Sequence, residues 1–417
     1  MFVFVIFVFW YFTGIHCYSI HDVYRLKDDL FKKSNYSAMI RPKINQSERT
    51  DIEIKMYLSR LLGLDTREQV LKTSGFFVIT WTDELLRWNP NDYSGIVEIT
   101  VQQKEIWFPD LYASNCIQGY QEFGSDDLRL YVNNSGTVDW EPSFTLSTSC
   151  VVDVSLFPVD VQICNIDIVP WMTTNHEINI KDPTFDNSLF EVPNGEFAII
   201  HTKTTQTCYT VYSNPNYELT ESRFTLTMAR QSTFYLLNVV GPFVAISSLC
   251  VISFLIDSQS GEKLTVSITV LLSLTVFLSV IEDQLPKTAN SISYFVIYVA
   301  LMIGMSFICV LCNVGTLYIH NKNPESPVPT WLGMNMIKET AVDNYRENSI
   351  TESHHRHSVK SSTYKSTSRR DCCDNLNGGC SCNHWPEVAR MADRVFLTLI
   401  TIALVSINIG FLIIHII

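Results

Sequence analysis

Charged side chains are scarce in this chain: only 17% of its 417 residues are Asp, Glu, Lys or Arg, whereas 47% are hydrophobic. This composition excludes a disordered or purely fibrous protein. Basic residues are the rarer sign, with 30 Lys and Arg against 42 Asp and Glu. Most of the acidic excess lies between Ile20 and Arg230, where 29 acidic side chains face 18 basic ones. The shortage of basic charge makes nucleic acid a poor candidate partner and a cation a better one.

Catalytic groupings are also missing from the segments that are expected to fold. They contain no Ser/His/Asp constellation, phosphate-binding loop or metal-ligand spacing, so we expect neither enzyme activity nor a cofactor. One cluster outside them, Cys372-Cys373 and Cys380-x-Cys382 beside His384, resembles a zinc site. Its spacing is irregular, and palmitoylation or simple disorder explains it as well. We therefore predict no metal site.

Long apolar runs are what the chain has in abundance. Three of them carry no Asp, Glu, Lys or Arg and are long enough to cross a hydrocarbon core of roughly 30 Å as helices: Phe234–Ile256, Ser293–His320 and Val395–Ile417. A fourth candidate helix, Leu264–Ile281, is apolar but carries Thr and Ser at regular intervals. The sequence therefore excludes a soluble protein and predicts four transmembrane helices.

The start of the chain is apolar as well. Residues Met1 to Ser19 are an apolar stretch followed by small and polar residues, which predicts a secretory signal peptide, with a further membrane anchor as the alternative. The segment that follows would face the oxidising side of the membrane. Three N-x-S sequons, at Asn35, Asn45 and Asn133, agree with this location and are predicted glycosylation sites.

The segment between these hydrophobic regions has the texture of a β protein. An amphipathic helix is predicted at His21–Leu30, and from Asp51 onward short alternating runs are separated by turn signals. This spacing is typical of an antiparallel β sandwich of about 200 residues. We expect the extracellular sandwich at 20–232, three transmembrane helices at 233–320, a largely disordered cytoplasmic loop at 321–393 and the last helix at 394–417. Both chain ends would then be extracellular.

The fourth candidate helix has one distinctive face. Steps of three and four residues, which fall on one side of a helix, connect Glu262, Thr265, Thr269, Leu272, Val276, Ser279 and Asp283, with Glu282 beside the last. A helix that faces only lipid has no reason to keep hydroxyl groups between carboxylates. A water-filled pore lined by several copies gives one: carboxylate rings concentrate cations at both mouths, and the section from Leu272 to Val276 closes by dewetting. The alternative is that Thr and Ser bond neighbouring helices.

Two cysteines in the β region enclose thirteen residues: Cys150 and Cys164, with Phe157-Pro158-Val159-Asp160 between them. In a secreted β domain such a pair most simply forms a disulfide. Together with Trp107-x-Pro109-Asp110, Arg230 and the run SGEKLTVSITVLLSLTVFLSV, in this order, it resembles the Cys-loop pentameric ligand-gated ion channels, and closest the nicotinic acetylcholine receptor subunits. The resemblance implies a homo- or heteropentamer with a central pore in the plasma membrane of nerve or muscle, postsynaptic in its usual setting.

The resemblance also implies where the agonist binds. Family members hold a cationic neurotransmitter, acetylcholine first among the candidates here, between subunits in a cage of aromatic rings, where each good cation–π contact contributes roughly 0.5 to 2 kcal/mol. Trp171 is the clear match. Two expected positions are altered, since Ser114 stands where the family has Tyr, and Phe76 where it has Trp. The other candidates for the ligand site are Tyr112, Tyr209, Tyr212, Tyr217, Asp139, Trp140 and Glu141.

The adjacent cysteine pair of α-type nicotinic subunits is absent, and only Cys208 stands in that loop. The chain thus resembles a non-α subunit. Cys116 and Cys208 lie in two loops that the family brings to the site, which leaves two alternatives: they bond and replace the missing pair as a clamp, or they remain buried free thiols.

The resemblance implies a gating path too. Phe157, Pro158 and Asp160 should press on the connection after the pore helix, near Pro286. Arg230 should pair with an acidic residue at the base of the sandwich. The candidates for that partner are Asp160, Asp65 and Glu68.

The function expected from all of this is a subunit of a cation-selective, neurotransmitter-gated channel that conducts Na+ and K+, with Ca2+ as a further candidate ion. Gly261-Glu262-Lys263 lacks the small residue and the proline insertion that anion-conducting relatives usually carry. One alternative is an accessory subunit that binds no agonist alone. Another is a non-conducting surface binding protein, although nothing in adhesion requires the hydroxyl face of the pore helix.

Overall fold

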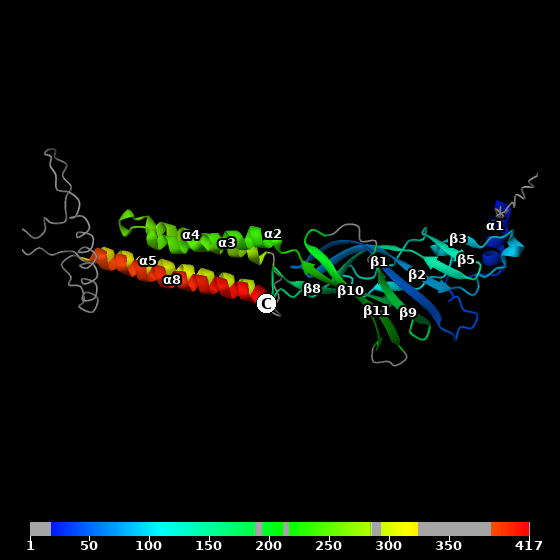
Figure 1. Ribbon diagram of the computed structural model, residues 1–417. Coiled ribbons are helices and arrows are strands. Elements are labelled where there is room, and N and C mark those ends of the chain that lie inside the picture. Colours follow the sequence, from blue (N-terminus) through cyan, green and yellow to red (C-terminus); the bar gives the residue numbers. More distant parts are fainter. Residues whose placement is uncertain are drawn as a thin grey trace, which may run out of the picture. The chain divides into compact units, whose positions relative to one another are not determined.

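The computed structural model describes residues 18–186, 188, 194–211, 217–283, 285, 293–323 and 385–416. The chain forms two compact units. The first contains the residues up to Ser232 together with Asp283–Ser291, and the second contains Thr233–Glu282 and Ile292–Ile417. Figure 1 shows strands in the first unit and helices in the second.

The first unit is a β sandwich of two sheets, as predicted. One sheet has the order β3 (Glu98–Gln102), β5 (Arg129–Asn133), β6 (Thr137–Trp140), β2 (Val70–Thr82), β1 (Thr50–Asp65) and β9 (Ile178–Asp186), and β7 (Ser143–Ser149) also pairs with β2. The other has the order β10 (Phe197–Thr210), β11 (Glu218–Arg230), β8 (Val161–Pro170) and β4 (Leu111–Ala113). All pairs are antiparallel except β1 with β9.

The sandwich core forms because the strands alternate between apolar and polar residues. In β2 and β11 every second side chain is buried, so each strand turns one face inward and one outward. The inward Phe77 of β2 meets Phe224 of β11 at a ring-centroid distance of 6.4 Å. This contact joins the two sheets, and it leaves the outward faces free for other roles.

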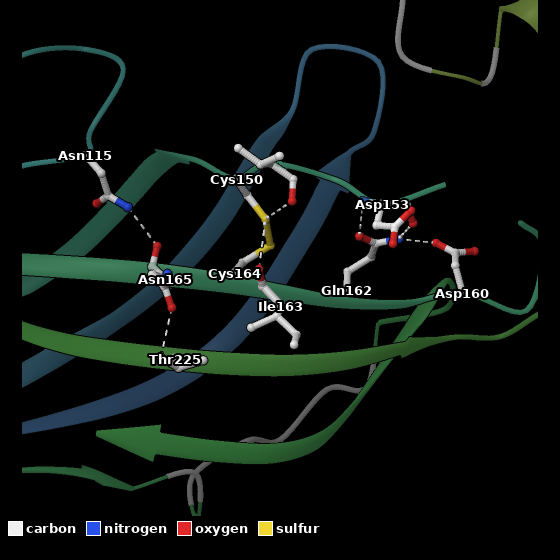
Figure 2. Close-up of a disulfide and its surroundings, with 10 residues drawn as sticks. Asn115, Cys150, Asp153, Asp160, Gln162, Ile163, Cys164, Asn165 and Thr225 are labelled. Carbon is white, nitrogen blue, oxygen red and sulfur yellow. Dashed lines mark hydrogen bonds between the residues drawn. A yellow bond between two sulfur atoms is a disulfide. The ribbon is translucent and has the colours of Figure 1, made fainter. Parts of the chain in front are cut away.

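A disulfide joins the sheets at a second place. Cys150 directly follows β7 and Cys164 lies in β8; the two are bonded, with their Cα atoms 5.2 Å apart, which confirms the predicted pair. Figure 2 shows Gln162 beside the bond, between Asp153 and Asp160. Its amide donates to the Asp153 carbonyl at 2.7 Å and to the Asp160 carboxylate, and its Oε1 accepts from the Asp153 N–H at 3.0 Å. The loop inside the disulfide is therefore held by side-chain bonds as well.

The predicted helix at the start of the sandwich is confirmed. It consists of α1 (Ile20–Lys27) and a π-helical turn, η1 (Asp28–Lys33). Ser19 caps it in a capping box with Asp22, which satisfies N–H groups that the first turn cannot bond. The predicted signal peptide lies almost entirely outside the described residues and remains a prediction.

Among the described residues, the second unit has four helices that are long and apolar enough to cross a membrane, as predicted. The first span, Thr233–Leu255, combines α2 (Thr233–Tyr235), η4 (Leu236–Val240), α3 (Gly241–Ile252) and η5 (Ser253–Leu255). The others are α4 (Glu262–Glu282), α5 (Tyr294–His320) and α8 (Trp385–Ile416). The last helix, expected at 394–417, begins earlier, at Trp385, and α8 runs on without a break because no Pro or Gly follows Pro386 until Gly410.

Polar contacts fasten these helices to one another. The Lys263 ammonium of α4 is fully buried, binds the Asp393 carboxylate of α8 and lies 5.6 Å from the ring centre of Phe254. Farther along α4, Ser267 accepts a hydrogen bond of 2.6 Å from the side-chain amide of Asn313 in α5. The buried charge thus has a partner, without which it would destabilise the bundle.

Candidate functional site: an aromatic cluster and a polar pore helix

Three aromatic rings meet at one end of the second sheet. Tyr112 lies in β4, opposite Val169 of β8, and Trp171 directly follows β8. The Trp171 ring meets Tyr112 edge-on at a centroid distance of 4.8 Å, and the Tyr120 ring lies 5.8 Å from Trp171 and 5.6 Å from Tyr112. We call Tyr112, Tyr120 and Trp171 the aromatic cluster. Trp171 remains 52% exposed, so its ring is available to a ligand.

Asp110 holds the turn that presents Trp171. Its carbonyl accepts the Trp171 N–H at 3.0 Å, and its carboxylate accepts the Met172 N–H at 2.5 Å and the Thr173 hydroxyl at 2.7 Å. One residue, through its carbonyl and its carboxylate, therefore fixes three successive residues. The Asp of the Trp107-x-Pro109-Asp110 motif thus positions Trp171, although the two are far apart in the sequence.

The electrostatic surroundings of the cluster are acidic. Burial, Glu122 and Asp110 together raise the pKa of Tyr120. Burial, Glu221, Tyr112 and Asp167 together raise the pKa of Tyr209, which places the β10 residue Tyr209 within electrostatic reach of the cluster. Carboxylates beside aromatic faces favour a cationic ligand over an anionic one.

An ion-paired group lies beside the cluster on β8 and β11. Arg223 donates from Nε to Asp167 at 2.8 Å and from Nη2 to Glu221 at 2.7 Å. Burial and the nearby Asp167 raise the pKa of Glu221 above its usual range. Asp167 also anchors the loop after β4, because its carbonyl accepts both the N–H and the hydroxyl of Ser114, at 2.8 and 3.3 Å. The Ser114 hydroxyl is therefore already hydrogen-bonded to the backbone.

The predicted ligand residues are distributed as follows. Trp171 and Tyr112 contact each other, and Tyr209 is near them. Tyr217, directly before β11, is exposed, and Tyr212 lies outside the described residues. Tyr120 was missed, because it stands in an irregular polar turn where no periodic pattern marks it.

The predicted complementary residues lie on the outward face of the first sheet. Phe76 of β2 stacks on Tyr57 of β1 with centroids 5.0 Å apart and ring planes at 10°. Asp139 of β6 accepts a hydrogen bond of 2.8 Å from Thr80, and the exposed Tyr131 of β5 stands opposite Asp139 in register. Glu141, which follows β6, is also exposed. Tyr57 and Tyr131 were not among the predicted residues.

The prediction that Trp140 contacts the ligand is wrong. Trp140 is only 1% exposed, its indole N–H donates to Gln103 at 3.1 Å, and its ring packs on Phe108 at 5.3 Å. The reason is the alternation of the strand: with Asp139 and Glu141 outward, the residue between them must point into the core.

The proposed bond between Cys116 and Cys208 is not formed in the structure, where both are free thiols. Cys116 is half-buried and bridges to Thr148 of the first sheet. Cys208 is exposed in β10 of the second sheet, where its Sγ accepts from Asn175 at 3.5 Å. Each cysteine is held by its own sheet, and neither is the fully buried thiol that the alternative assumed.

The arginine before the first span is confirmed to pair with Asp160. Arg230 donates to Asp160 from Nε at 2.7 Å and from Nη2 at 3.1 Å, and it also binds Glu196 at 2.5 Å, a partner that the sequence did not indicate. The side chain of Asp65, another candidate partner, accepts the Glu68 N–H at 2.9 Å instead.

Aromatic rings complete the surroundings of Arg230. Its guanidinium lies 4.5 Å from the ring centre of Phe197 and 5.3 Å from that of Phe157. Phe157 and Pro158, expected to press on the connection after the pore helix, are buried, whereas Val151, Asp153 and Leu156 of the same loop are exposed. Pro286 lies outside the described residues.

Helix α4, the expected pore helix, has a buried face and an exposed face. The buried face consists of Lys263, Ser267, Val270, Leu274 and Ile281. The exposed residues include every member of the distinctive face that the sequence predicted: Glu262, Thr265, Thr269, Leu272, Val276 and Ser279, with Glu282 and Asp283 at the end. Asp283 forms an exposed ion pair of 3.6 Å with Arg67.

The alternative explanation of the polar face of α4 was that its Thr and Ser bond neighbouring helices, and the hydrogen bonds of the hydroxyl groups test it. The Thr269 and Thr275 hydroxyls each donate at 2.8 Å to a carbonyl of their own helix, those of Val266 and Leu272. Ser267, which does bond a neighbouring helix, is on the buried face. In the described part of the chain, the exposed Thr269 and Thr275 hydroxyls thus bond their own helix.

Known proteins are similar in sequence to this chain over most of its length. The family described as neurotransmitter-gated ion-channel ligand binding domain matches residues 23–232, and the neurotransmitter-gated ion-channel transmembrane region matches residues 239–381. The neuronal acetylcholine receptor subunit beta-4 of Gallus gallus is 30% identical over 314 residues, 74% of this chain and 65% of that protein.

Two further relatives are a little less similar. The neuronal acetylcholine receptor subunit beta-2 of Carassius auratus is 29% identical over 73% of this chain and 66% of its own length. The acetylcholine receptor subunit alpha-like of Manduca sexta is 29% identical over 74% of this chain and 61% of its own length. The chain thus spans about two thirds of the length of these relatives. With both family regions matched in order, this chain belongs to the neurotransmitter-gated ion channels, a family of channels and not of enzymes, and its relatives are nicotinic acetylcholine receptor subunits.

Proposed function

We propose that this chain is a subunit of a cation-selective channel in the plasma membrane that opens when a small cationic amine, acetylcholine first among the candidates, binds at the aromatic cluster. The observation that carries the proposal is the half-exposed Trp171 ring, which contacts Tyr112 and has carboxylates nearby. A quaternary ammonium group fits such a surface, because it has no hydrogen-bond needs and gains cation–π energy from each ring.

The cluster is one half of a cage, because its three rings contact one another and leave one side open. The outward face of the first sheet, with Phe76 on Tyr57 and Asp139 nearby, supplies the other half on a neighbouring subunit. Two different faces of one chain that fit each other generate a closed ring. A homo- or heteropentamer with a central pore is the assembly that the family implies.

The pore follows from α4. Glu262 is exposed at its start, and exposed Thr and Ser lead to Glu282 at its end. Rings of carboxylates at both mouths favour Na+, K+ and Ca2+ over chloride. The exposed Leu272 and Val276 form the apolar constriction of the closed state.

The rest of the proposal concerns topology and coupling. A cleaved signal peptide, glycans at Asn35, Asn45 and Asn133, and extracellular chain ends fit a receptor whose sandwich faces the synaptic cleft. The segment 321–393 is then cytoplasmic. The Arg230 to Asp160 pair connects the sandwich to the first span along the chain and supports a role in gating.

A second candidate is an accessory subunit that needs an α-type partner to bind agonist. Three features favour it: the chain lacks the adjacent cysteine pair, Ser114 offers no ring, and its hydroxyl is bonded to Asp167. Phe76, in place of Trp, has a weaker aromatic face.

Expression in oocytes separates the two candidates. The chain is expressed alone and together with an α-type nicotinic subunit, and currents are recorded under acetylcholine, choline and a panel of biogenic amines. A current from the chain alone supports a self-sufficient receptor, whereas a current only with the partner supports the accessory role. If the protein reaches the cell surface but carries no current either alone or with the partner, both candidates are refuted.

A further inference from the structure

Two buried thiols face each other between the first and third membrane helices. Cys250 of α3 is 3% exposed and Cys309 of α5 is 1% exposed, and both are free. The helices that carry them, α3 and α5, pack against each other. Neither residue belongs to the aromatic cluster or to the exposed face of α4, so the proposed function leaves them unexplained.

Packing on both sides of the pair fixes its level in the bundle. Toward the start of the two helices, Phe243 of α3 contacts Tyr298 of α5 at a centroid distance of 5.6 Å. Toward their ends, the Asn313 amide of α5 donates to the Ser253 hydroxyl at 3.0 Å. Because Cys250 precedes Ser253 by three residues and Cys309 precedes Asn313 by four, the thiols lie about one turn from that bond. The helices therefore run in the same direction with the two cysteines side by side.

A third polar group borders the pair. Ser306, one turn before Cys309 on α5, is buried as well. Its hydroxyl has no hydrogen-bond partner among the residues that the structure describes. Two thiols and a hydroxyl in one buried site make a polar pocket inside an apolar bundle, and a hydroxyl there can pass a proton from a reacting thiol.

We propose that Cys250 and Cys309 form a dithiol modification site, which an organic hydroperoxide dissolved in the membrane oxidises to a disulfide between α3 and α5. The two cysteines lie at one level on packed helices, and such proximity is the first requirement for a disulfide. The hydroperoxide class follows from the location, since a buried site within the membrane-spanning helices excludes charged aqueous oxidants, and the neighbouring Ile308 and Leu311 on the surface of α5 are apolar and exposed.

The chemistry balances in two steps. One thiol attacks the hydroperoxide, the O–O bond breaks, and a sulfenic acid and an alcohol form. The second thiol then attacks the sulfenic sulfur, the S–S bond forms and water leaves. Two thiols have lost two electrons and two protons, and the hydroperoxide has become the alcohol and water. The product ties α3, which follows Arg230 along the chain, to α5.

The test is chemical and uses the full chain in cell membranes. Membranes are treated with cumene hydroperoxide, free thiols are alkylated, and the protein is digested without reduction and examined by mass spectrometry. We expect a linked peptide that contains Cys250 and Cys309 and that a reductant separates. C250S and C309A should lose it, whereas C312S, which removes a half-buried thiol on the same helix, should keep it.

Agonist-evoked current is a second measurement. We expect the hydroperoxide to reduce the current of the unmodified chain, and a reductant to restore it, with no effect on C250S. If both thiols remain fully alkylated after treatment, or if the linked peptide contains Cys312 in place of either cysteine, the site is refuted. Because the linked peptide is detected without any current, failure of this inference is distinguishable from failure of the proposed function.

Discussion

Arg230 and Asp160 form a buried, two-pronged ion pair, with Nε–Oδ1 and Nη2–Oδ2 distances of 2.7 and 3.1 Å and side chains that are 1% and 2% exposed. Arg230 is the last residue of β11, directly before the first membrane span, and Asp160 lies in the loop closed by the disulfide. The pair therefore fastens that loop to the strand that leads into the membrane.

Replacing Arg230 by Gln should abolish agonist current and most surface protein. The change leaves the Asp160 carboxylate buried without its cation, which costs about 3 to 5 kcal/mol of folding free energy. Surface biotinylation and the thermal denaturation of the solubilised protein measure the effect.

Arg67→Gln is the matched control, since Arg67 belongs to an exposed ion pair with Asp283 that contributes about 0 to 1 kcal/mol. It should leave the denaturation temperature nearly unchanged. Wild-type stability and currents in Arg230→Gln would show that the pair has no such role.

Tyr120→Ala should weaken agonist binding about 2- to 30-fold, the equivalent of roughly 0.5 to 2 kcal/mol for one aromatic contact. Tyr120 closes the aromatic cluster against Trp171 and Tyr112, so its loss removes a ring and loosens the other two. Displacement of a radiolabelled agonist from membranes measures it. Tyr120→Phe keeps the ring and should retain the affinity, as should Tyr24→Ala in α1. Equal affinity of Tyr120→Ala and the wild type would remove Tyr120 from the site.

Agonist affinity should fall as the pH is lowered below neutral, in part through Glu221. Burial and Asp167 raise the pKa of Glu221 above its usual 4.5, so it takes up a proton at a higher pH than an ordinary glutamate. Because its pKa in the folded state is raised, protonated Glu221 favours the fold, and this contribution is lost as the pH rises through that pKa. Agonist affinity changes in the opposite direction to this stability term. Protonation of Glu221 removes negative charge near the cationic agonist, so the affinity falls as the pH is lowered.

Glu221→Gln should therefore bind agonist weakly already at neutral pH and show a flatter pH profile. Glu53→Gln, which changes an exposed carboxylate on β1, should reproduce the wild-type profile. An unchanged slope in Glu221→Gln would assign the pH dependence to another group.

Asp393→Asn should destabilise the membrane bundle by about 3 to 5 kcal/mol, because the fully buried Lys263 ammonium then has no carboxylate partner. The double variant Lys263→Met/Asp393→Leu removes both charges and should recover most of the surface protein. Glu387→Gln, at an exposed position in the first turn of α8, is the control. If the double variant is no better than Asp393→Asn, the ion pair is not the cause.

The sequence predicts the fold well because its signals are local. Apolar runs define the four spans, and alternation defines the sandwich. The parallel pairing of β1 with β9 was not expected, since 112 residues separate Asp65 from Ile178 and no local pattern records which strands meet.

The site is predicted less completely, because contacts between distant segments decide it. The Asp110 motif and Trp171 carry strong signals, whereas Tyr120 and the Glu196 partner of Arg230 carry none in the sequence. Trp140 was misassigned although the strand alternation, applied strictly, places it inside. The predicted bond between Cys116 and Cys208 is not formed, because the two cysteines are held on different sheets.

The most direct test of the central claim is the reversal potential of the agonist-evoked current, in wild type and in Glu262→Lys. Current is evoked with acetylcholine, with the α-type partner if needed, and external sodium is then replaced by N-methyl-D-glucamine. We predict a strong negative shift for the wild type and a much smaller one for Glu262→Lys, since Glu262 is the exposed carboxylate at the start of α4. A wild-type reversal potential that does not shift when sodium is replaced, but shifts with the chloride concentration, would contradict the account.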